Sequence, residues 1–250
     1  MVQQIYLQYN RIIMEQALLN LWEAYRGRMA SKELNEILER GICYSEISGS
    51  HRILVTGMNP SFRKGDPACE KYEVPFNYQA VVKGREDRYF TAFDRLFPEA
   101  YRAEVDYLDL LNIRETRQRT VWKFIRDPKG LELFAANLRM NQLLMEQVVR
   151  PRLIMVKNHG SWGLWGKDAT AEGNIWMGYR FEPVEGFDAL PCGEVLRIAG
   201  LIDHPDRVAC RELKETNLKG TLVLFTNHFQ YSAKEKLPTP ELMAELCRRI

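Results

Sequence analysis

The chain has 250 residues, of which 46% are hydrophobic and 27% are charged. This balance is typical of a folded globular protein and excludes a disordered, collagen-like or disulfide-stapled chain. A chain of this length can bury most of its unfolded surface, so we expect a single domain over residues 1–250. The 35 basic and 33 acidic side chains give a net charge of only +2, so any anion-binding surface has to be local.

The five cysteines are spread along the chain without a Cys-x-x-Cys pair, which argues against a zinc ribbon or a close-spaced iron–sulfur site. Such scattered thiols are typical of a reducing compartment. The chain does not open on a basic stretch followed by an apolar run, and no apolar stretch approaches the ~20 residues of a membrane span. We therefore expect a cytoplasmic protein that binds neither a metal nor a membrane.

Apolar residues at helical spacing predict an N-terminal helical segment over residues 1–45. A short apolar run at 52–56 then predicts the first buried strand. A long irregular segment rich in glycine and proline follows, and the next helical stretch, 88–103, is expected to break at Pro98.

Further apolar runs at 105–111, 153–156 and 221–225 predict three more strands, with a helix near 131–149 between the first two of these. Thr239 and Pro240 predict the start of a C-terminal helix over 239–250. Buried strands that alternate with helices predict an α/β fold, a three-layer α/β/α domain with a four-stranded parallel central sheet. Short β-like pieces at 179–184 and 194–202 are left outside this sheet.

Each of the four apolar runs ends at a polar amide or imidazole. These residues are Asn59, Asn112, the pair Asn158-His159 and the pair Asn227-His228. In a parallel sheet the carboxyl ends of the strands lie at one edge, which is where open α/β sheets bind ligands. No carboxylate directly ends a run; the nearest is Asp109, three residues before Asn112. The other interpretation is that asparagine and glycine simply form the turns after strands.

Several segments resemble the uracil-DNA glycosylase superfamily, and most closely its single-strand-selective monofunctional branch. Gly57-Met58-Asn59-Pro60-Ser61 is similar to the first motif of that branch, and Val74-Pro75-Phe76 to its base-stacking segment. Leu110-Leu111-Asn112 resembles the strand end that recognises uracil, and His228 stands where the second motif begins. The resemblance implies a glycosylase-like core over residues 52–237.

The resemblance also implies roles for individual residues. Asn59 would position a water molecule, and His228 would stabilise charge on the departing base. Met58, Phe76 and Asn112 would bind that base. Residues 114–129 carry six basic and two acidic side chains, a local charge of +4 that begins just after Asn112 and is either a solvated face or a phosphate-binding one. The expected contacts to the DNA backbone are Ser61, Arg63, Lys64, Arg114, Arg117 and Arg119.

We therefore expect a monomeric DNA glycosylase that hydrolyses the N-glycosidic bond of uracil or a related damaged base, in single- or double-stranded DNA, without a metal or another cofactor. His228 is followed by Phe229-Gln230-Tyr231-Ser232, which lacks the proline and serine of the second motif. This difference favours an alternative, a glycosylase-like protein that binds nucleic acid or nucleotides with little or no activity. A third possibility is a hydrolase of small nucleosides, because +2 is a modest charge for a DNA-binding protein.

Overall fold

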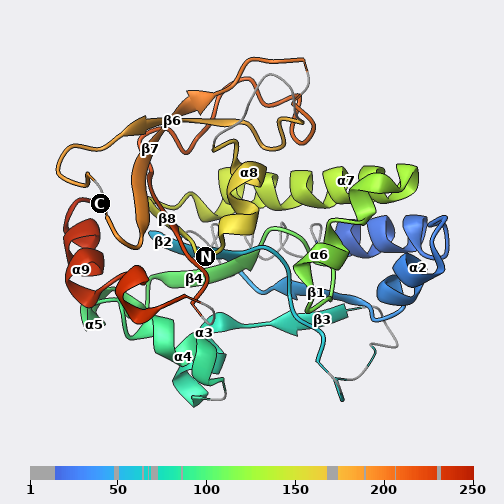
Figure 1. The fold of residues 1–250 in the computed structure, drawn as a ribbon, viewed down its shortest axis with the longest axis horizontal. Coiled ribbons are helices and arrows are strands. Elements are labelled where there is room, and N and C mark those ends of the chain that lie inside the picture. The colour runs from blue at the N-terminus through green and yellow to red at the C-terminus, as the bar shows by residue number, and fades with distance from the viewer. Residues whose placement is uncertain are drawn as a thin grey trace, which may run out of the picture.

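The computed structural model describes residues 15–47, 51–63, 65–66, 68, 73–85, 87–167, 174–188, 190–205, 207–229 and 232–250. Within this part of the chain, six strands form one mixed sheet in the order β4-β2-β5-β8-β7-β6 (Figure 1). The strands are β2 (Ile53–Gly57), β4 (Val105–Asp109), β5 (Leu153–Val156), β6 (Tyr179–Pro183), β7 (Gly193–Leu201) and β8 (Leu222–Thr226).

The four strands predicted from apolar runs are confirmed as parallel neighbours. β2 pairs with β4 on one side and with β5 on the other, and β5 pairs with β8. All residues of β2, β5 and β8 are buried, as expected for strands that are covered on both faces. The carboxyl ends of these four strands therefore meet at one edge of the sheet.

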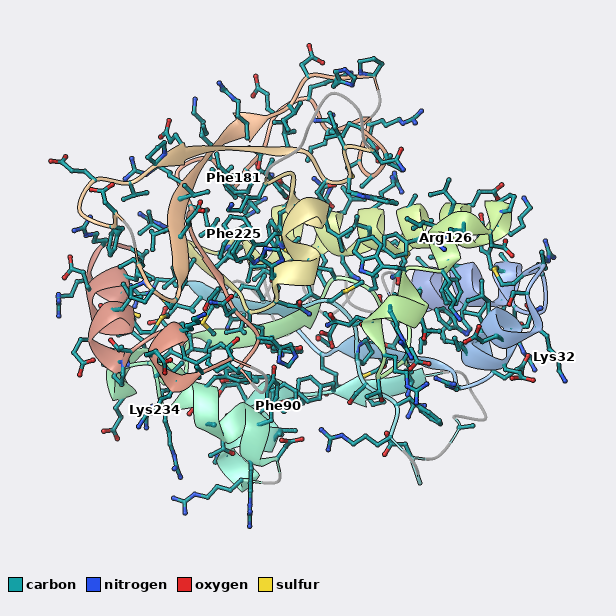
Figure 2. All side chains as sticks on the ribbon, viewed as in Figure 1. Lys32, Phe90, Arg126, Phe181, Phe225 and Lys234 are labelled. Atoms are coloured by element: carbon teal, nitrogen blue, oxygen red, sulfur yellow. The ribbon has the colours of Figure 1, made fainter. Side chains whose placement is uncertain are left out.

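The prediction of a sheet with only four strands is wrong, because two antiparallel strands extend it beyond β8. β7 pairs antiparallel with β8, and β6 pairs antiparallel with β7. Both added strands keep exposed or half-exposed side chains along much of their length, which is the pattern of an antiparallel edge with one solvated face. Phe181 of β6 packs on Phe225 of β8 at 5.1 Å between ring centroids, which joins this edge to the core (Figure 2).

Helices cover both faces of the sheet, with α7 on one side and α3 and α4 on the other (Figure 1). Side chains alternate between the faces along each strand. Leu54 belongs to the cluster that packs on Phe134 of α7, whereas Ile53 and Val55 belong to the cluster that contains Phe93 of α4. The helices are α2 (Lys32–Leu38), α3 (Tyr78–Gly84), α4 (Arg88–Asp94), α5 (Glu99–Arg102), α6 (Gln118–Val121), α7 (Pro128–Leu144), α8 (Trp162–Trp165) and α9 (Pro240–Arg248), and residues 15–25 are also helical.

Local sequence explains where several of these helices begin. The Asp127 side chain accepts hydrogen bonds from the amides of Lys129 and Gly130, which α7 would otherwise leave unpaired. Thr239 caps α9 in the same way by accepting from the Leu242 amide. Pro98 separates α4 from α5, as the sequence predicts.

A separate pair of parallel strands, β1 (Ile42–Ser45) and β3 (Glu73–Phe76), lies beside the main sheet (Figure 1). The sequence does not predict this pair. Ser45 and Phe76 are in register at its end, and the Cys43 amide donates to the Asn112 carbonyl at 3.2 Å. The pair is therefore fastened to the segment that follows β4, and it brings Phe76 to the carboxyl edge of the main sheet.

Candidate functional site

A cavity of about 1030 Å³ opens at the carboxyl edge of the parallel strands. Its wall includes Gly57 and Asp109, which end β2 and β4, and Lys157, which directly follows β5. The position agrees with the general rule that open α/β sheets bind ligands outside the carboxyl ends of their strands. This cavity is our candidate functional site.

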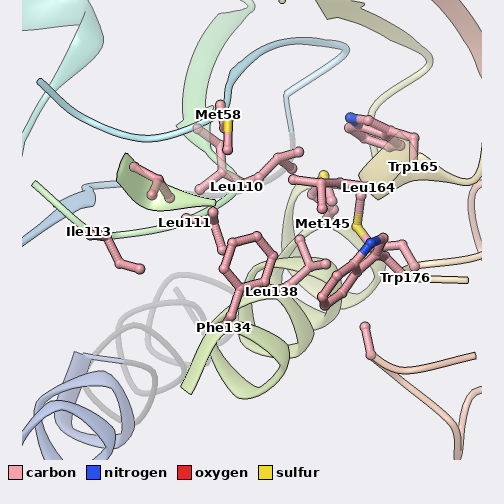
Figure 3. Packing of buried hydrophobic residues seen from close by; sticks show 14 of the residues in the cluster. Met58, Leu110, Leu111, Ile113, Phe134, Leu138, Met145, Leu164, Trp165 and Trp176 are labelled. Carbon is pink, nitrogen blue, oxygen red and sulfur yellow. The ribbon is translucent and has the colours of Figure 1, made fainter. Parts of the chain in front are cut away.

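Three predicted residues from segments far apart in the chain border this cavity, namely Asn59, Phe76 and His228. Met58 also borders it, but the residue is only 1% exposed and belongs to the cluster that packs toward α7. Figure 3 shows the Met58 side chain among the residues of that cluster, close to Leu110. Met58 therefore offers little side-chain surface to a ligand.

Asn112 does not border the cavity; the structure places its side chain in the core. Its Oδ1 accepts hydrogen bonds from Asn137 Nδ2 at 2.5 Å and from Asn141 Nδ2 at 2.9 Å, both on α7. Its Nδ2 donates to the Cys43 carbonyl at 2.7 Å. With 1% of its surface exposed and these three bonds made, Asn112 ties β1 and the end of β4 to α7.

The end of β4 at Asp109 explains this placement, because Leu110, Leu111 and Ile113 beyond it all belong to the cluster on the α7 side. Leu108 and Leu110 belong to the cluster on the α7 side of the sheet, and Asn112 bonds to helix residues on that same side. Tyr107 belongs to the opposite cluster, and Asp109 follows it on the cavity side. The expected recognition amide therefore lies in a segment that packs toward α7 and away from this cavity.

The Asn59 side chain is occupied by the loop that it belongs to. Its Nδ2 donates to the carbonyls of Pro60 at 3.0 Å, Ile113 at 3.1 Å and Glu115 at 2.6 Å. Its Oδ1 is buried and has no hydrogen-bond partner among the described residues. Asn59 therefore holds two segments of the cavity rim together, and its remaining acceptor is shut away from solvent.

Asp109 ends β4, whereas the sequence predicts that this strand continues to Leu111. The Tyr107 hydroxyl donates to Asp109 Oδ1 at 2.7 Å. Burial raises the pKa of Asp109 to about 6, against the opposing effects of Lys157 and of the Tyr107 hydrogen bond. A carboxylate thus does end one of the parallel strands, and it faces the cavity.

Lys157 is a second residue whose role the sequence did not reveal. It is 5% exposed, and its Nζ donates to the Tyr89 hydroxyl at 2.6 Å. The ammonium lies 4.3 Å from the ring centroid of Tyr89 and 4.7 Å from that of Tyr107, where the ring faces attract a cation. Burial lowers the pKa of Lys157 to about 8, although Asp109 opposes this change.

His228 and Phe76 also border the cavity. Burial lowers the pKa of His228, and the positive charge of Lys157 lowers it further, so the imidazole is neutral at pH 7 and keeps one N–H donor. Phe76 packs at 4.8 Å from Phe90 and at 5.6 Å from Tyr107, between ring centroids. Phe90, labelled in Figure 2, belongs to α4.

The residues expected to contact phosphates differ in how far they are exposed to solvent. Ser61 and Arg63 are exposed and border the cavity, whereas Lys64 lies outside the described residues. Arg114 is 5% exposed, because its guanidinium packs over the Phe62 ring and donates to the Arg40 carbonyl, so it is not available to a ligand. Arg117 and Arg119 are exposed, on either side of Gln118, which borders the cavity.

No helix in the described part of the chain is long and apolar enough to cross a membrane. Within the same residues, no group of three or more His, Cys, Asp and Glu side chains is arranged to hold a metal ion. No protein-family model, curated protein or solved structure matches this chain.

Proposed function

We propose that this protein is a DNA glycosylase that hydrolyses the bond between the sugar and uracil or a related damaged base. The observation that carries the proposal is the meeting of Asn59, Phe76 and His228 at one cavity on the carboxyl edge of the sheet. All three residues belong to segments that resemble motifs of the glycosylase superfamily. Enzymes that act on a base turn it out of the helical stack into such a pocket.

In this proposal Phe76 offers a partly exposed ring on which a planar base can stack. Neutral His228 donates a hydrogen bond to the base as negative charge develops on it, and stabilisation of that charge is a large part of catalysis in such sites. Asn59 keeps the rim in place through its three carbonyl contacts.

A residue other than Asn112 has to recognise the polar edge of the base. Asn112 is committed to the core and does not border the cavity, whereas Asn158, which is 6% exposed, follows Lys157 after β5 and does border it. The Asn158 Oδ1 accepts a hydrogen bond from the Gly160 amide at 2.9 Å, which fixes the plane of its side chain. We therefore move the recognition role from Asn112 to Asn158, because a fixed amide can discriminate between donors and acceptors on a base.

One observation favours the alternative of a nucleic-acid-binding or nucleotide-binding protein with little activity. Asn59, the residue expected to position the water, has its amide nitrogen engaged and its oxygen buried. A protein of this kind would retain the cavity and the stacking ring but would not cleave the bond.

Oligonucleotides that each carry one modified base distinguish these possibilities. The protein is incubated with labelled single and double strands, and alkali then cleaves the strands at abasic sites. We expect cleavage of the uracil strand, and His228→Ala should slow excision by ~10²–10³, the usual cost of losing one preorganised donor. His204→Ala, which changes a histidine that does not border the cavity, is the matched control.

Binding of the strands without any cleavage would replace the glycosylase proposal by the binding-protein alternative. Release of a base from free nucleosides, with no action on DNA, would instead indicate a nucleoside hydrolase. Equal rates for the wild type and His228→Ala would contradict the role of the imidazole.

A further inference from the structure

Asp109 is held in position at the cavity by residues of two neighbouring strands, β2 and β4. It ends β4, is partly exposed and borders the cavity. The Tyr107 hydroxyl donates to its Oδ1 at 2.7 Å, which fixes one carboxylate oxygen. Gly57 faces it in register across β2 and β4, and the missing side chain of this glycine provides the space that the carboxylate fills.

Other carboxylates at the cavity accept hydrogen bonds from backbone amides of neighbouring residues and so stabilise the local fold. Glu115 accepts from the Arg40 guanidinium at 2.6 Å and from the Arg117 amide at 2.7 Å. Asp87 caps α4 by accepting from the Tyr89 amide at 2.7 Å, and Asp66 accepts from the Arg63 amide at 2.7 Å. Asp109 Oδ1, in contrast, accepts its hydrogen bond from a side chain, the Tyr107 hydroxyl.

Hydrolysis also needs an acceptor for a water proton, and Asn59 does not supply an accessible one, because its Oδ1 is buried. The segment that carries Asn59 runs alongside the segment that carries Asp109. The Leu110 amide donates to the Gly57 carbonyl at 3.0 Å, and the Leu111 amide donates to the Met58 carbonyl at 2.9 Å. Asp109 therefore stands beside the place where the sequence had predicted the water-positioning residue.

We propose that Asp109 is the general base that accepts a proton from the attacking water, an inference that rests on the proposed glycosylase function. The water oxygen forms a bond to the sugar carbon while the bond from that carbon to the base nitrogen breaks. The electron pair of the broken bond leaves with the base, to which His228 donates a hydrogen bond. The proton held by Asp109 then passes to the departed base or to solvent, which restores the carboxylate.

The electrostatic surroundings suit this role. Burial raises the pKa of Asp109 to about 6, so the carboxylate is ionised at pH 7 but still has an appreciable affinity for a proton. Lys157 favours the ionised form through its positive charge, and so does the hydrogen bond from Tyr107. Removal of either influence should raise the pKa of Asp109.

The other titratable groups around Asp109 limit what a pH profile can report. Burial raises the pKa of the Cys43 thiol to about 12 and the pKa of the Tyr107 hydroxyl well above 10, so both stay neutral near pH 7. Lys157, with a pKa of about 8, interacts with Asp87 and Tyr89 as well as with Asp109, and it lowers the pKa of His228. His228, with its lowered pKa, titrates on the acid side together with Asp109, so the Asp109→Asn variant assigns the acid limb, and the alkaline limb should report Lys157.

The test is single-turnover excision of uracil from a single-stranded oligonucleotide as a function of pH. The wild-type rate should rise with pH around a midpoint of about 6. Asp109→Asn should lower the rate by ~10²–10⁴, the usual contribution of a general base, and remove the acid limb. Tyr107→Phe removes only the hydroxyl, and it should shift the acid limb to higher pH because a hydrogen bond that favours the carboxylate is lost.

Asp66→Asn, which changes another carboxylate at the cavity rim, is the matched control and should leave the profile unchanged. Asp109→Asn that excises uracil as fast as the wild type would overturn this inference while the glycosylase function stands. If the wild type excises no base from any strand, the proposed function fails and the role of Asp109 fails with it. If circular dichroism shows that Asp109→Asn is unfolded, the pH profile of Tyr107→Phe tests the role of Asp109 instead. An acid limb at the same pH as in the wild type would then overturn the inference.

Discussion

Gly57 and Asp109 face each other in register across β2 and β4, and the carboxylate of one occupies the space beside the backbone of the other. A Cβ atom at Gly57 would lie 2.1 Å from Asp109 Oδ1 and 2.2 Å from the Tyr107 hydroxyl oxygen. The need for glycine here is therefore steric, since Gly57 is not among the residues with a positive φ.

Gly57→Ala should displace the Asp109 carboxylate and break its hydrogen bond with Tyr107. Overpacking of this kind typically lowers the free energy of unfolding by about 1–3 kcal/mol, which urea denaturation would measure. Gly163→Ala is the control, because a Cβ at this position meets no atom within 4 Å. Equal stability of the two variants would show that the strands separate easily at Gly57.

Asn112→Ala tests the structural role of the residue expected to read the base. The change leaves the side chains of Asn137 and Asn141 and the Cys43 carbonyl without the partner that they have in the core. Each buried polar group left unpaired costs about 1–3 kcal/mol, so thermal unfolding should move to a clearly lower temperature. The choice of base by the folded variant should stay the same, whereas a changed choice at unchanged stability would return Asn112 to the cavity.

The sequence predicted the four parallel strands because each is a continuous apolar run that both faces of the sheet bury. Apolar runs do not show where a buried strand ends, however, and β4 ends two residues earlier than its run, at Asp109. Asp109 borders the cavity, whereas Leu110, Leu111 and Ile113 all pack on the α7 side and Asn112 bonds to α7 there. The apolar run continues past the end of the strand, which is why the sequence placed Asn112 at the strand end.

Two further features lay beyond the reach of the sequence. The strand pair β1 and β3 joins segments of four residues each, and β3 contains Pro75, which argues against a strand. The aromatic surroundings of Lys157 come from Tyr89 on α4 and Tyr107 on β4, which only the folded chain brings together. A lysine directly after a buried apolar run is the one signal that could have drawn attention to this residue.

Asp106 should make the stability of the protein depend on pH. This residue is 5% exposed, with its Oδ1 accepting from the Tyr107 amide and its Oδ2 lying 3.5 Å from His51 Nε2. Burial raises the pKa of Asp106 from its ordinary value of 3.8 to about 7. The folded state thus binds a proton more tightly than the unfolded state between these values, so this contribution to stability is lost as pH rises through about 7.

Asp106→Asn keeps the shape of the side chain but cannot ionise. It should therefore be more stable than the wild type above pH 7, and its advantage should shrink toward pH 4, where the wild-type carboxyl is protonated. Urea denaturation at several pH values measures the difference, with the exposed Asp188→Asn as control. An advantage that is the same at every pH would mean that Asp106 has an ordinary pKa in the folded protein.

The exposed arginines beside the cavity should govern how strongly DNA binds and not which base is chosen. Arg117 and Arg119 flank Gln118 at the cavity rim, and neither has an ion pair among the described residues. On a single strand each phosphate contact adds about 0.7 to the slope of log affinity against log salt concentration, so replacing both by alanine should flatten that slope by about 1.4. Phosphate contacts carry no sequence information, and the order of preference among damaged bases should therefore persist.

Lys214 and Lys219 provide the matched double-alanine control, because both are exposed and Lys219 precedes β8, at the edge of the sheet opposite the cavity. Fluorescence anisotropy with a labelled single strand at several salt concentrations gives the slopes directly. The control pair should keep the wild-type slope. A loss of affinity that is equal at low and high salt in Arg117→Ala/Arg119→Ala would contradict the phosphate contacts, since an electrostatic contribution has to weaken as salt screens it.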